Sequence, residues 1–247
     1  MSGVGRPKGL EAMRRKHQRA RRTMIAALVL AAAIPTSASA LQQEAAAGIA
    51  LSMMDVEFLE RADNSRIYMV DSTLARIDEF IDFGCPTCRS FYILRTDSLK
   101  ATFVDTGRAN FVVRMFPLAR LMRGFHAAEA ALCAGGLNDR QGFEAMQHRL
   151  YMNQSVWQPL QDPIPVFLQF AADINLPLEE FQACLIRDTV APLILSDMNL
   201  AQLMAVEGTP TFVLNRGGEL TGEVKLTGEE GISSFDEAVT RLSGPGD

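Results

Sequence analysis

Short apolar runs predict the strands of this chain. Residues 76–83 alternate in part between apolar and polar side chains, and residues 109–116 are apolar enough to be buried in a sheet. A helical pattern that ends near Gly107 lies between them, and strand, helix and strand at this spacing favour a βαβ unit with a parallel sheet. Two further strands are predicted at residues 211–214 and 219–226.

Helical patterns occupy most of the remaining sequence. Residues 124–206 are interpreted as a helical block, and a last helix is predicted at residues 231–242. A turn is expected at residues 215–218, which are Asn-Arg-Gly-Gly. Glycine and proline residues should divide the block into four or more helices: Gly135, Gly136, Pro159, Pro163, Pro165 and Pro177.

An apolar stripe marks a further helix over residues 42–62. Ala47, Leu51, Met54 and Phe58 follow one another at helical spacing. Such a stripe either docks a helix on its own domain or forms a contact between two copies of the chain. The sequence leaves both interpretations open.

The first 40 residues have the order of a secretory signal peptide. A basic run at residues 14–22 precedes the eleven apolar residues 24–34, and the small residues Ala38 and Ala40 follow. A membrane-spanning helix needs about 20 apolar residues, although an uncleaved anchor remains the alternative. We expect cleavage near Ala40 and a periplasmic or otherwise exported protein. Both Sec and twin-arginine export stay open, because Arg21-Arg22 only partly matches the second signal, and Met13 could equally be the start.

Charge is unevenly distributed along the chain. Residues 1–40 contain eight of the 24 Lys and Arg residues and one of the 29 Asp and Glu residues, so the body has a formal net charge of about −12. Nucleic-acid binding needs a basic face. An acidic body therefore argues against a nucleic-acid partner.

Cys85-Pro86-Thr87-Cys88 stands where a predicted strand meets a predicted helix. The N-terminus of a helix presents unpaired N–H groups and a partial positive charge, and both stabilise a thiolate on Cys85. Pro86 suits the first helical turn, where its missing N–H costs nothing. Cys88 lies one turn further on, so the pattern indicates that Cys85 is the attacking sulfur and Cys88 the resolving one.

A zinc site and a static disulfide are the two other interpretations of this pair. Zinc usually needs a second cysteine pair or clustered histidines. Cys133 and Cys184 are far apart in the sequence, and His17, His126 and His148 show no ligand spacing. A CxxC beside a βαβ pattern therefore indicates a redox centre, with no metal expected and no catalytic role for the histidines.

Cys133 and Cys184 are the remaining two cysteines of an exported chain with an even count. We expect them to form a structural disulfide between two helices of the helical block. The alternative is two separate buried thiols, which pack as small apolar side chains.

Several motifs together resemble the DsbA-type branch of the thioredoxin superfamily, in particular its exported bacterial members. The resemblance covers most of residues 76–225, and the CxxC combined with a distant Gly-Thr-Pro-Thr-Phe is its most specific part. The motifs are EFIDFGCPTCRSF (79–91), FHAAEAALCA (125–134), FEAMQHRLYMNQSVW (143–157), FQACL (181–185) and EGTPTFVLN (207–215).

The resemblance implies an α/β, thioredoxin-like fold with a helical insertion between the βαβ half and the ββα half. The expected domains are a signal peptide at 1–40, an N-terminal helical extension at 41–75, a thioredoxin-like domain at 76–118 and 207–247, and the insertion at 119–206. No cofactor is expected, because the family's chemistry uses the sulfur atoms of the chain.

Individual positions also carry over from the family. Cys85 and Cys88 match the redox pair, and Pro210 matches a proline that is cis in this superfamily and lies beside the pair. Thr209 would then offer its backbone to an extended substrate segment. Glu79 matches a buried acid near the resolving cysteine in some relatives, although a partly exposed strand carboxylate is the alternative.

Thr87 departs from the pattern of the family. Many of its oxidases have His at this position, whereas a threonine hydroxyl carries no positive charge. Pro86 and Thr87 are expected to contact substrate, and the Cys85 thiolate should be stabilised less than in those oxidases. The direction of electron flow therefore stays open.

Three functions remain to be compared. The first is a disulfide oxidase that acts on unfolded or thiol-containing exported proteins and is reoxidised by a membrane redox partner. The second is an isomerase or reductase, which would favour a homodimer through residues 42–62. The third is a non-enzymatic module that acts as a chaperone or binds Cu(I), for which soft sulfur is suited.

Overall fold

The computed structural model describes residues 55–118, 122–216 and 224–243. The predicted signal peptide lies outside the described residues, and so do residues 219–223 of the last predicted strand. None of the helices in these described ranges is long and apolar enough to span a membrane.

The predicted helix over residues 42–62 is described only in its last part. Ala47, Leu51 and Met54 lie outside the described residues, while residues 55–64 are helical and include Phe58. Phe58 is half-buried and packs against the hydrophobic core.

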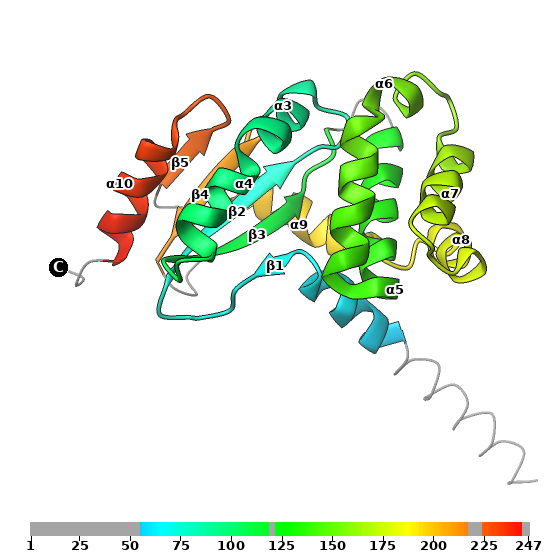
Figure 1. Ribbon diagram of the computed structural model, residues 1–247, viewed down its shortest axis with the longest axis horizontal. Coiled ribbons are helices and arrows are strands. Elements are labelled where there is room, and N and C mark those ends of the chain that lie inside the picture. The colour runs from blue at the N-terminus through cyan, green and yellow to red at the C-terminus, as the bar shows by residue number, and fades with distance from the viewer. Residues whose placement is uncertain (1–54, 119–121, 217–223, 244–247) are drawn as a thin grey trace, which may run out of the picture. The chain divides into compact units, whose positions relative to one another are not determined.

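A five-stranded sheet forms the centre of the protein, with the strand order β1-β3-β2-β4-β5 (Figure 1). β2 and β3 are parallel, as the βαβ pattern predicted, and the other neighbouring pairs are antiparallel. The strands are β1 (Ile67–Tyr68), β2 (Ala75–Ile81), β3 (Ala109–Met115), β4 (Thr211–Asn215) and β5 (Val224–Thr227). β1 is short and was not expected.

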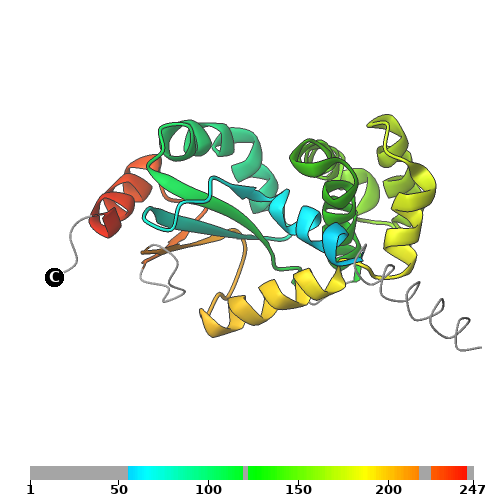
Figure 2. The ribbon, with the colours of Figure 1, turned by 90° about the horizontal axis from the view of Figure 1, so that it is seen from below.

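Helices cover both faces of this sheet. Figure 2 shows α3 and α4 above the sheet and α9 below it, with α10 at the far end from the helical insertion. The helices are α3 (Pro86–Leu94), α4 (Thr96–Leu99), the π-helix η1 (Lys100–Val104), α5 (Met122–Met152), α6 (Gln154–Trp157), α7 (Ile164–Asp173), α8 (Leu178–Ile186), α9 (Ala191–Leu203) and α10 (Ile232–Ser243). The single helix expected before Gly107 is thus three consecutive segments, and α5 to α9 form the predicted insertion between β3 and β4.

Three aromatic rings join α3 and α10 to β4. Phe91 of α3 lies 4.6 Å from Phe212 of β4, and Phe212 lies 4.9 Å from Phe235 of α10, measured between ring centroids. All three side chains are buried. Aromatic pairs at this separation stabilise a core beyond the area they bury, so α3 is held firmly against the sheet.

Gly135 and Gly136, which were expected to separate two helices, instead lie inside α5. A Cβ atom on Gly135 would come within 2.1 Å of Ser65 Oγ, and one on Gly136 within 2.4 Å of Phe58 Cζ. The two glycines therefore allow the end of the N-terminal helix to approach α5 closely.

The break in α5 comes slightly later, at Asn138 and Asp139. Their φ/ψ angles are −142°/39° and 46°/−147°, so the chain leaves the helical conformation for two residues. Gly142 follows the break, and a Cβ atom there would lie 2.2 Å from the carbonyl oxygen of Ala134. Only glycine leaves room for this close passage of the two halves of α5.

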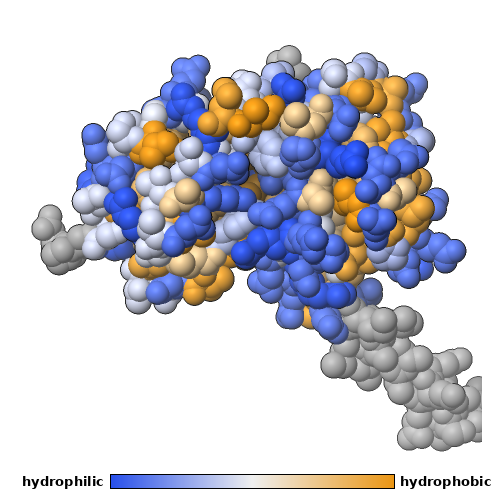
Figure 3. Space-filling model, viewed as in Figure 1, coloured by the Kyte–Doolittle hydropathy of each residue, from blue (hydrophilic) through white to orange (hydrophobic). Residues whose placement is uncertain are grey.

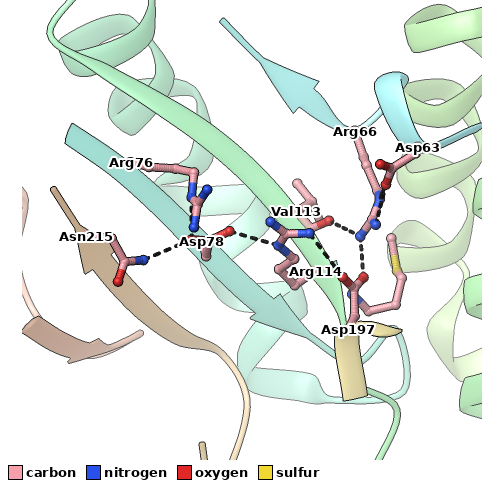
Figure 4. A network of polar contacts seen from close by, with 9 residues as sticks. Asp63, Arg66, Arg76, Asp78, Val113, Arg114, Asp197 and Asn215 are labelled. Atoms are coloured by element: carbon pink, nitrogen blue, oxygen red, sulfur yellow. Dashed lines mark hydrogen bonds and ion pairs between the residues drawn. The ribbon is translucent and has the colours of Figure 1, made fainter. Parts of the chain in front are cut away.

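Below the sheet, buried ion pairs connect α9 to two strands and the N-terminal segment (Figure 4). Asp197 of α9 pairs with Arg66, and it accepts hydrogen bonds from Arg114 Nη1 at 3.2 Å and from the Met115 N–H at 2.8 Å. Both Asp197 and Arg66 are about 2% exposed. Buried charges need such partners, so this network sets where α9 lies against the sheet.

Asp78 of β2 extends the network toward β4. Its carboxylate accepts hydrogen bonds from Arg76 Nε and Arg114 Nε, each at 2.8 Å, and from Asn215 Nδ2 at 3.1 Å. Arg114 therefore bridges Asp78 and Asp197.

Candidate redox site

Cys85 lies in the loop between β2 and α3. Its φ of −81° and ψ of 122° are extended, and Pro86 takes the first position of α3. The Cys85 carbonyl accepts the first helical hydrogen bond, from the Arg89 N–H at 3.2 Å. The Cys85 side chain therefore stands at the N-terminus of α3, as predicted from the place of the CxxC where a strand meets a helix.

Cys85 and Cys88 both carry free thiols, and their surroundings differ. Cys85 is half-buried, whereas Cys88 is 1% exposed. A hydrogen bond from the Cys88 thiol lowers the pKa of Cys85 to about 5, against the opposing effect of partial burial. The N–H groups of Cys88 and Thr87 also stabilise the thiolate. Burial raises the pKa of Cys88 well above its ordinary value.

The loop before β4 faces the Cys85 sulfur. The peptide bond between Thr209 and Pro210 is cis. The Cys85 thiol donates a hydrogen bond to the Thr209 carbonyl oxygen at 3.2 Å. Gly228 packs against this loop, because a Cβ atom there would lie 2.6 Å from Pro210 Cγ. The structure thus brings the Cys85–Cys88 pair together with Thr209 and Pro210, which lie more than 120 positions further along the sequence.

Two grooves lie next to this site. The β5 groove, of about 660 Å³, is lined by Thr87, the loop with Thr209 and Pro210, and residues 225–229. The α6 groove, of about 650 Å³, is lined by Cys85 and Pro86 together with residues of the insertion. Both grooves are open to solvent, and an extended chain in the α6 groove can reach Cys85, which lines it.

Glu79 lies on β2 and is only 4% exposed. Burial raises its pKa to about 8, although the positive charge of Lys100 acts in the opposite direction. Glu79 is therefore a buried acid, and the alternative of a partly exposed strand carboxylate is wrong. A group with this pKa can hold or release a proton near neutral pH.

Asp82 is an acid near Cys85 that sequence reasoning missed. Its carboxylate accepts hydrogen bonds from the Gly84 N–H at 2.7 Å and from the Leu118 N–H at 3.0 Å. Burial raises its pKa, and the negative charge of Cys85 contributes in the same direction. Asp82 also lines the α6 groove. The only sequence signal was its place within the EFIDFG motif.

Tyr151 lies behind the thiols and was also missed. Its ring is buried and contacts Phe83 at 5.0 Å and Tyr92 at 4.9 Å between centroids. Burial, followed by the charges of Cys88 and Glu79, raises the pKa of Tyr151 well above its ordinary value. The phenol therefore stays neutral beside the buried thiol.

Two glutamines of the insertion hold the loop before Cys85. Gln154 Nε2 donates hydrogen bonds to the carbonyl oxygens of Phe83 at 2.7 Å and Cys85 at 3.1 Å. Gln158 Nε2 donates one to the Gly84 carbonyl at 2.7 Å. Three successive carbonyls are therefore bound from α6 and the residue that follows it. Gln154 lies within the motif at residues 143–157, but the motif does not indicate which groups it contacts.

The remaining residues singled out in the sequence lie in ordinary surroundings. His126 Nδ1 lies 2.9 Å from Glu129 Oε2, and His148 Nδ1 lies 3.4 Å from the hydroxyl of Tyr92. Trp157 is buried, and its indole N–H donates to the Leu150 carbonyl. Within the described ranges, no group of three or more His, Cys, Asp or Glu side chains is arranged to hold a metal ion.

A disulfide joins Cys133 of α5 to Cys184 of α8. Its cysteines are 0% and 5% exposed, so the bond lies in the core of the insertion. It closes a loop with a sequence separation of 51 residues. In the chain-entropy account, such a bond stabilises the folded protein by about 4 kcal/mol.

Exposed apolar side chains form separate patches on an otherwise polar face. Figure 3 shows one such patch over α3. Ile93 and Leu94 of this helix are 44% and 73% exposed.

Comparison with known proteins agrees with this architecture. A family model described as thioredoxin matches residues 71–223. A Rickettsia prowazekii protein named as a protein-disulfide oxidoreductase is 23% identical over 154 residues, which are 62% of this chain and 55% of that protein. This chain thus spans little more than half the length of that relative.

Two solved structures have the same fold. α-DsbA1 of Wolbachia pipientis superposes with a TM-score of 0.60 at 21% identity, over 72% of this chain and 90% of that one. Oxidised BdbD of Bacillus subtilis superposes with a TM-score of 0.60 at 19% identity, over 72% and 92%. These likenesses confirm the predicted thioredoxin-like fold with its helical insertion.

Proposed function

The chain belongs to the thioredoxin family, and from this premise we propose that it is an exported thiol–disulfide oxidoreductase that introduces disulfides into exported proteins. The observation that carries the proposal is the asymmetry of the thiol pair. Cys85 is half-buried with a pKa of about 5, while Cys88 is buried and its pKa is raised. A thiol with a low pKa is both a ready thiolate and a good leaving group.

The reaction begins with the disulfide between Cys85 and Cys88. A substrate thiolate attacks Sγ of Cys85, the bond between the two sulfurs breaks, and Cys88 leaves and takes up a proton. A second substrate thiolate then attacks the substrate sulfur of this mixed disulfide and releases Cys85 as a thiolate. The substrate gains a disulfide, and the protein gains two electrons and a proton on Cys88.

Residues around the pair support each step. The raised pKa of Glu79, caused by burial, suits a group that supplies or accepts the proton of Cys88. The backbone beside Pro210 offers hydrogen bonds to an extended substrate, with Pro86 and Thr87 at the rim of the two grooves. Reoxidation needs an oxidant, which we assign to a membrane redox partner on the outer side of the membrane.

The proposal includes the export of the protein and the direction in which electrons flow through the Cys85–Cys88 pair. Residues 1–40 would direct export, and the pair would be mainly oxidised in that compartment. An isomerase or reductase is the second candidate, because Thr87 brings no positive charge to the thiolate. A low pKa of Cys85 favours the oxidase, since it stabilises the reduced pair.

Trapping tests the proposed chemistry. Replacing Cys88 with Ser removes the resolving thiol, so mixed disulfides between Cys85 and exported proteins should accumulate and run as thiol-sensitive bands on non-reducing gels. The Cys85→Ser variant is the matched control and should trap nothing. Alkylation of whole cells should find the native pair mostly oxidised. A mostly reduced pair, combined with efficient rescue of scrambled substrates, would favour the isomerase.

A further inference from the structure

Two carbonyl groups of the loop before the redox pair are hydrogen-bonded by side chains and not by the backbone of the sheet or of α3. Phe83 and Gly84 follow the end of β2 and precede α3. Their carbonyl oxygens accept hydrogen bonds from Gln154 and Gln158. Phe83 is 1% exposed, so water does not replace a lost bond easily.

The opposite side of the same loop is held by Asp82. The Gly84 N–H donates to the Asp82 carboxylate at 2.7 Å, and the Cys85 N–H donates to the Asp82 carbonyl at 3.0 Å. A peptide unit carries its N–H and C=O on opposite sides. Glutamine donors on one side and Asp82 on the other therefore fix the rotation of each peptide unit that leads to Cys85.

The two glutamines are themselves well supported. Gln154 is only 6% exposed. The neighbouring Trp157 donates its indole N–H to Leu150 at 2.8 Å, and Arg123 Nη1 donates to the backbone carbonyl of Gln158. The short helix α6 is therefore tied to α5 on both sides, and its side chains reach the loop from a rigid base.

From this arrangement we infer that Gln154 and Gln158 are positioning residues for Cys85, through which the helical insertion aligns the attacking sulfur with the N-terminus of α3. The inference rests on the proposed function and extends it to residues that touch neither sulfur. The hydrogen bond from the Cys88 thiol stabilises the Cys85 thiolate most, and the N–H groups of Cys88 and Thr87 at the start of α3 add to it. If the loop can rotate, Sγ leaves this position and the thiolate loses those hydrogen bonds.

Replacing Gln154 with Met tests the inference, because methionine has a similar length and no donor. We expect the alkylation profile of Cys85 in the reduced full chain to move to higher pH. Below the midpoint, the rate should fall roughly three- to tenfold, which corresponds to a pKa change of about half to one unit. The equilibrium with glutathione should shift by a similar factor toward the disulfide.

Gln158→Met supplies a second measurement in case the first variant folds poorly. Gln158 is less buried and makes one of the three bonds, so we expect a smaller effect, roughly twofold to threefold. The matched control is Asn110→Ala. Asn110 also donates a buried amide N–H to a loop carbonyl, that of Asp71 at 2.6 Å, but in a loop between β1 and β2.

The control separates positioning from general stability. Asn110→Ala should lower the unfolding midpoint and leave the Cys85 profile unchanged. A native profile in folded Gln154→Met, or an equal shift in Asn110→Ala, would overturn the inference. The profile needs no substrate protein, so a chain that fails to oxidise substrates would refute the proposed function while the glutamine variants still report on positioning.

Discussion

Cys85 obtains its acidity from hydrogen bonds. The thiol of Cys88 and two N–H groups at the start of α3 stabilise its thiolate. Thr87 is exposed at the rim of the β5 groove and contributes its backbone rather than a charge. The acidity of Cys85 can therefore be increased by a single side chain at position 87.

We predict that Thr87→His makes the disulfide more oxidising. A protonated imidazole beside Sγ favours the thiolate, so the pKa of Cys85 should fall and the reduced pair should become more stable. The equilibrium constant with glutathione should shift toward the reduced protein by roughly three- to tenfold below about pH 6. Thr87→Asn, which brings no charge, is the control. A shift of equal size in both variants would show that charge is not the cause.

Glu79 makes the stability of the protein depend on pH. Its pKa of about 8 lies above its ordinary value of 4.5 because of burial. Between these values the folded protein keeps a proton that the unfolded chain releases, so the free energy of unfolding must fall as pH rises. The slope from this group reaches about 1.4 kcal/mol per pH unit.

Glu79→Gln should remove this slope. At about pH 4 the carboxyl is largely protonated in both the folded and the unfolded native protein, so the two proteins should have similar free energies of unfolding. At about pH 8 the free energy of unfolding of the variant should be higher by a few kcal/mol. Urea unfolding at several pH values measures the difference. Parallel curves for the two proteins would mean that Glu79 is already ionised in the folded state at neutral pH.

At the scale of single elements, α5 shows what a local pattern can and cannot predict. The helical block, the strands around Cys85 and the last helix were correct, because each depends on the periodicity of its own residues. Gly135-Gly136 was read as a break, yet its small size serves contact with Ser65 and Phe58. Two residues later, the backbone of Asn138 leaves the helical conformation. A glycine can either end a helix or allow another element to pack closely against it, and only the packing in the folded protein shows which of the two applies.

Gly142→Ala should therefore be costly. Its Cβ would lie 2.2 Å from the Ala134 carbonyl oxygen, which is backbone and cannot turn away. We expect a loss of about 1–3 kcal/mol in the free energy of unfolding, measured by urea denaturation. Gly231→Ala is the control, since its Cβ would meet only Ser233 Oγ at 3.5 Å. Equal stability of the two variants would contradict the close contact.

At the scale of the whole molecule, the site is assembled from parts that are distant in the sequence. The CxxC and the Gly-Thr-Pro motif could be found in the sequence because each is a short run of residues that resembles a motif of a known family. Gln154 and Tyr151 lie within the motif at residues 143–157, and Gln158 follows it directly. Their contacts with the redox site could not be predicted, because these depend on where the fold places the insertion. Asp197 escaped notice for the same reason, since an aspartate in an apolar helix gives no indication of its partner.

Asp197→Ala should destabilise the whole fold. It would leave Arg66 and Arg114 short of a partner in a buried region, and breaking such pairs costs about 3–5 kcal/mol. The alkylation profile of Cys85 should stay unchanged, because Asp197 belongs to α9, which Figure 2 shows on the face of the sheet opposite α3. Asp236→Ala, which breaks an exposed pair with Arg108, should cost less than about 1 kcal/mol. Comparable losses would argue against a structural role for the buried network.

The disulfide between Cys133 and Cys184 has a consequence for how many electrons the protein exchanges with its surroundings. Thiol–disulfide exchange requires a thiolate to reach a sulfur atom. The Cys133–Cys184 bond is enclosed by the insertion, whereas Cys85 lines the α6 groove, which is open to solvent. A mild reductant added to the folded protein should therefore deliver two electrons per chain, and mass spectrometry after alkylation should find labels on Cys85 and Cys88 alone. Four labels should require unfolding first. The chain contains two cysteine pairs that can form disulfides, and the fold leaves the Cys85–Cys88 pair accessible to thiols in solution while it encloses the other.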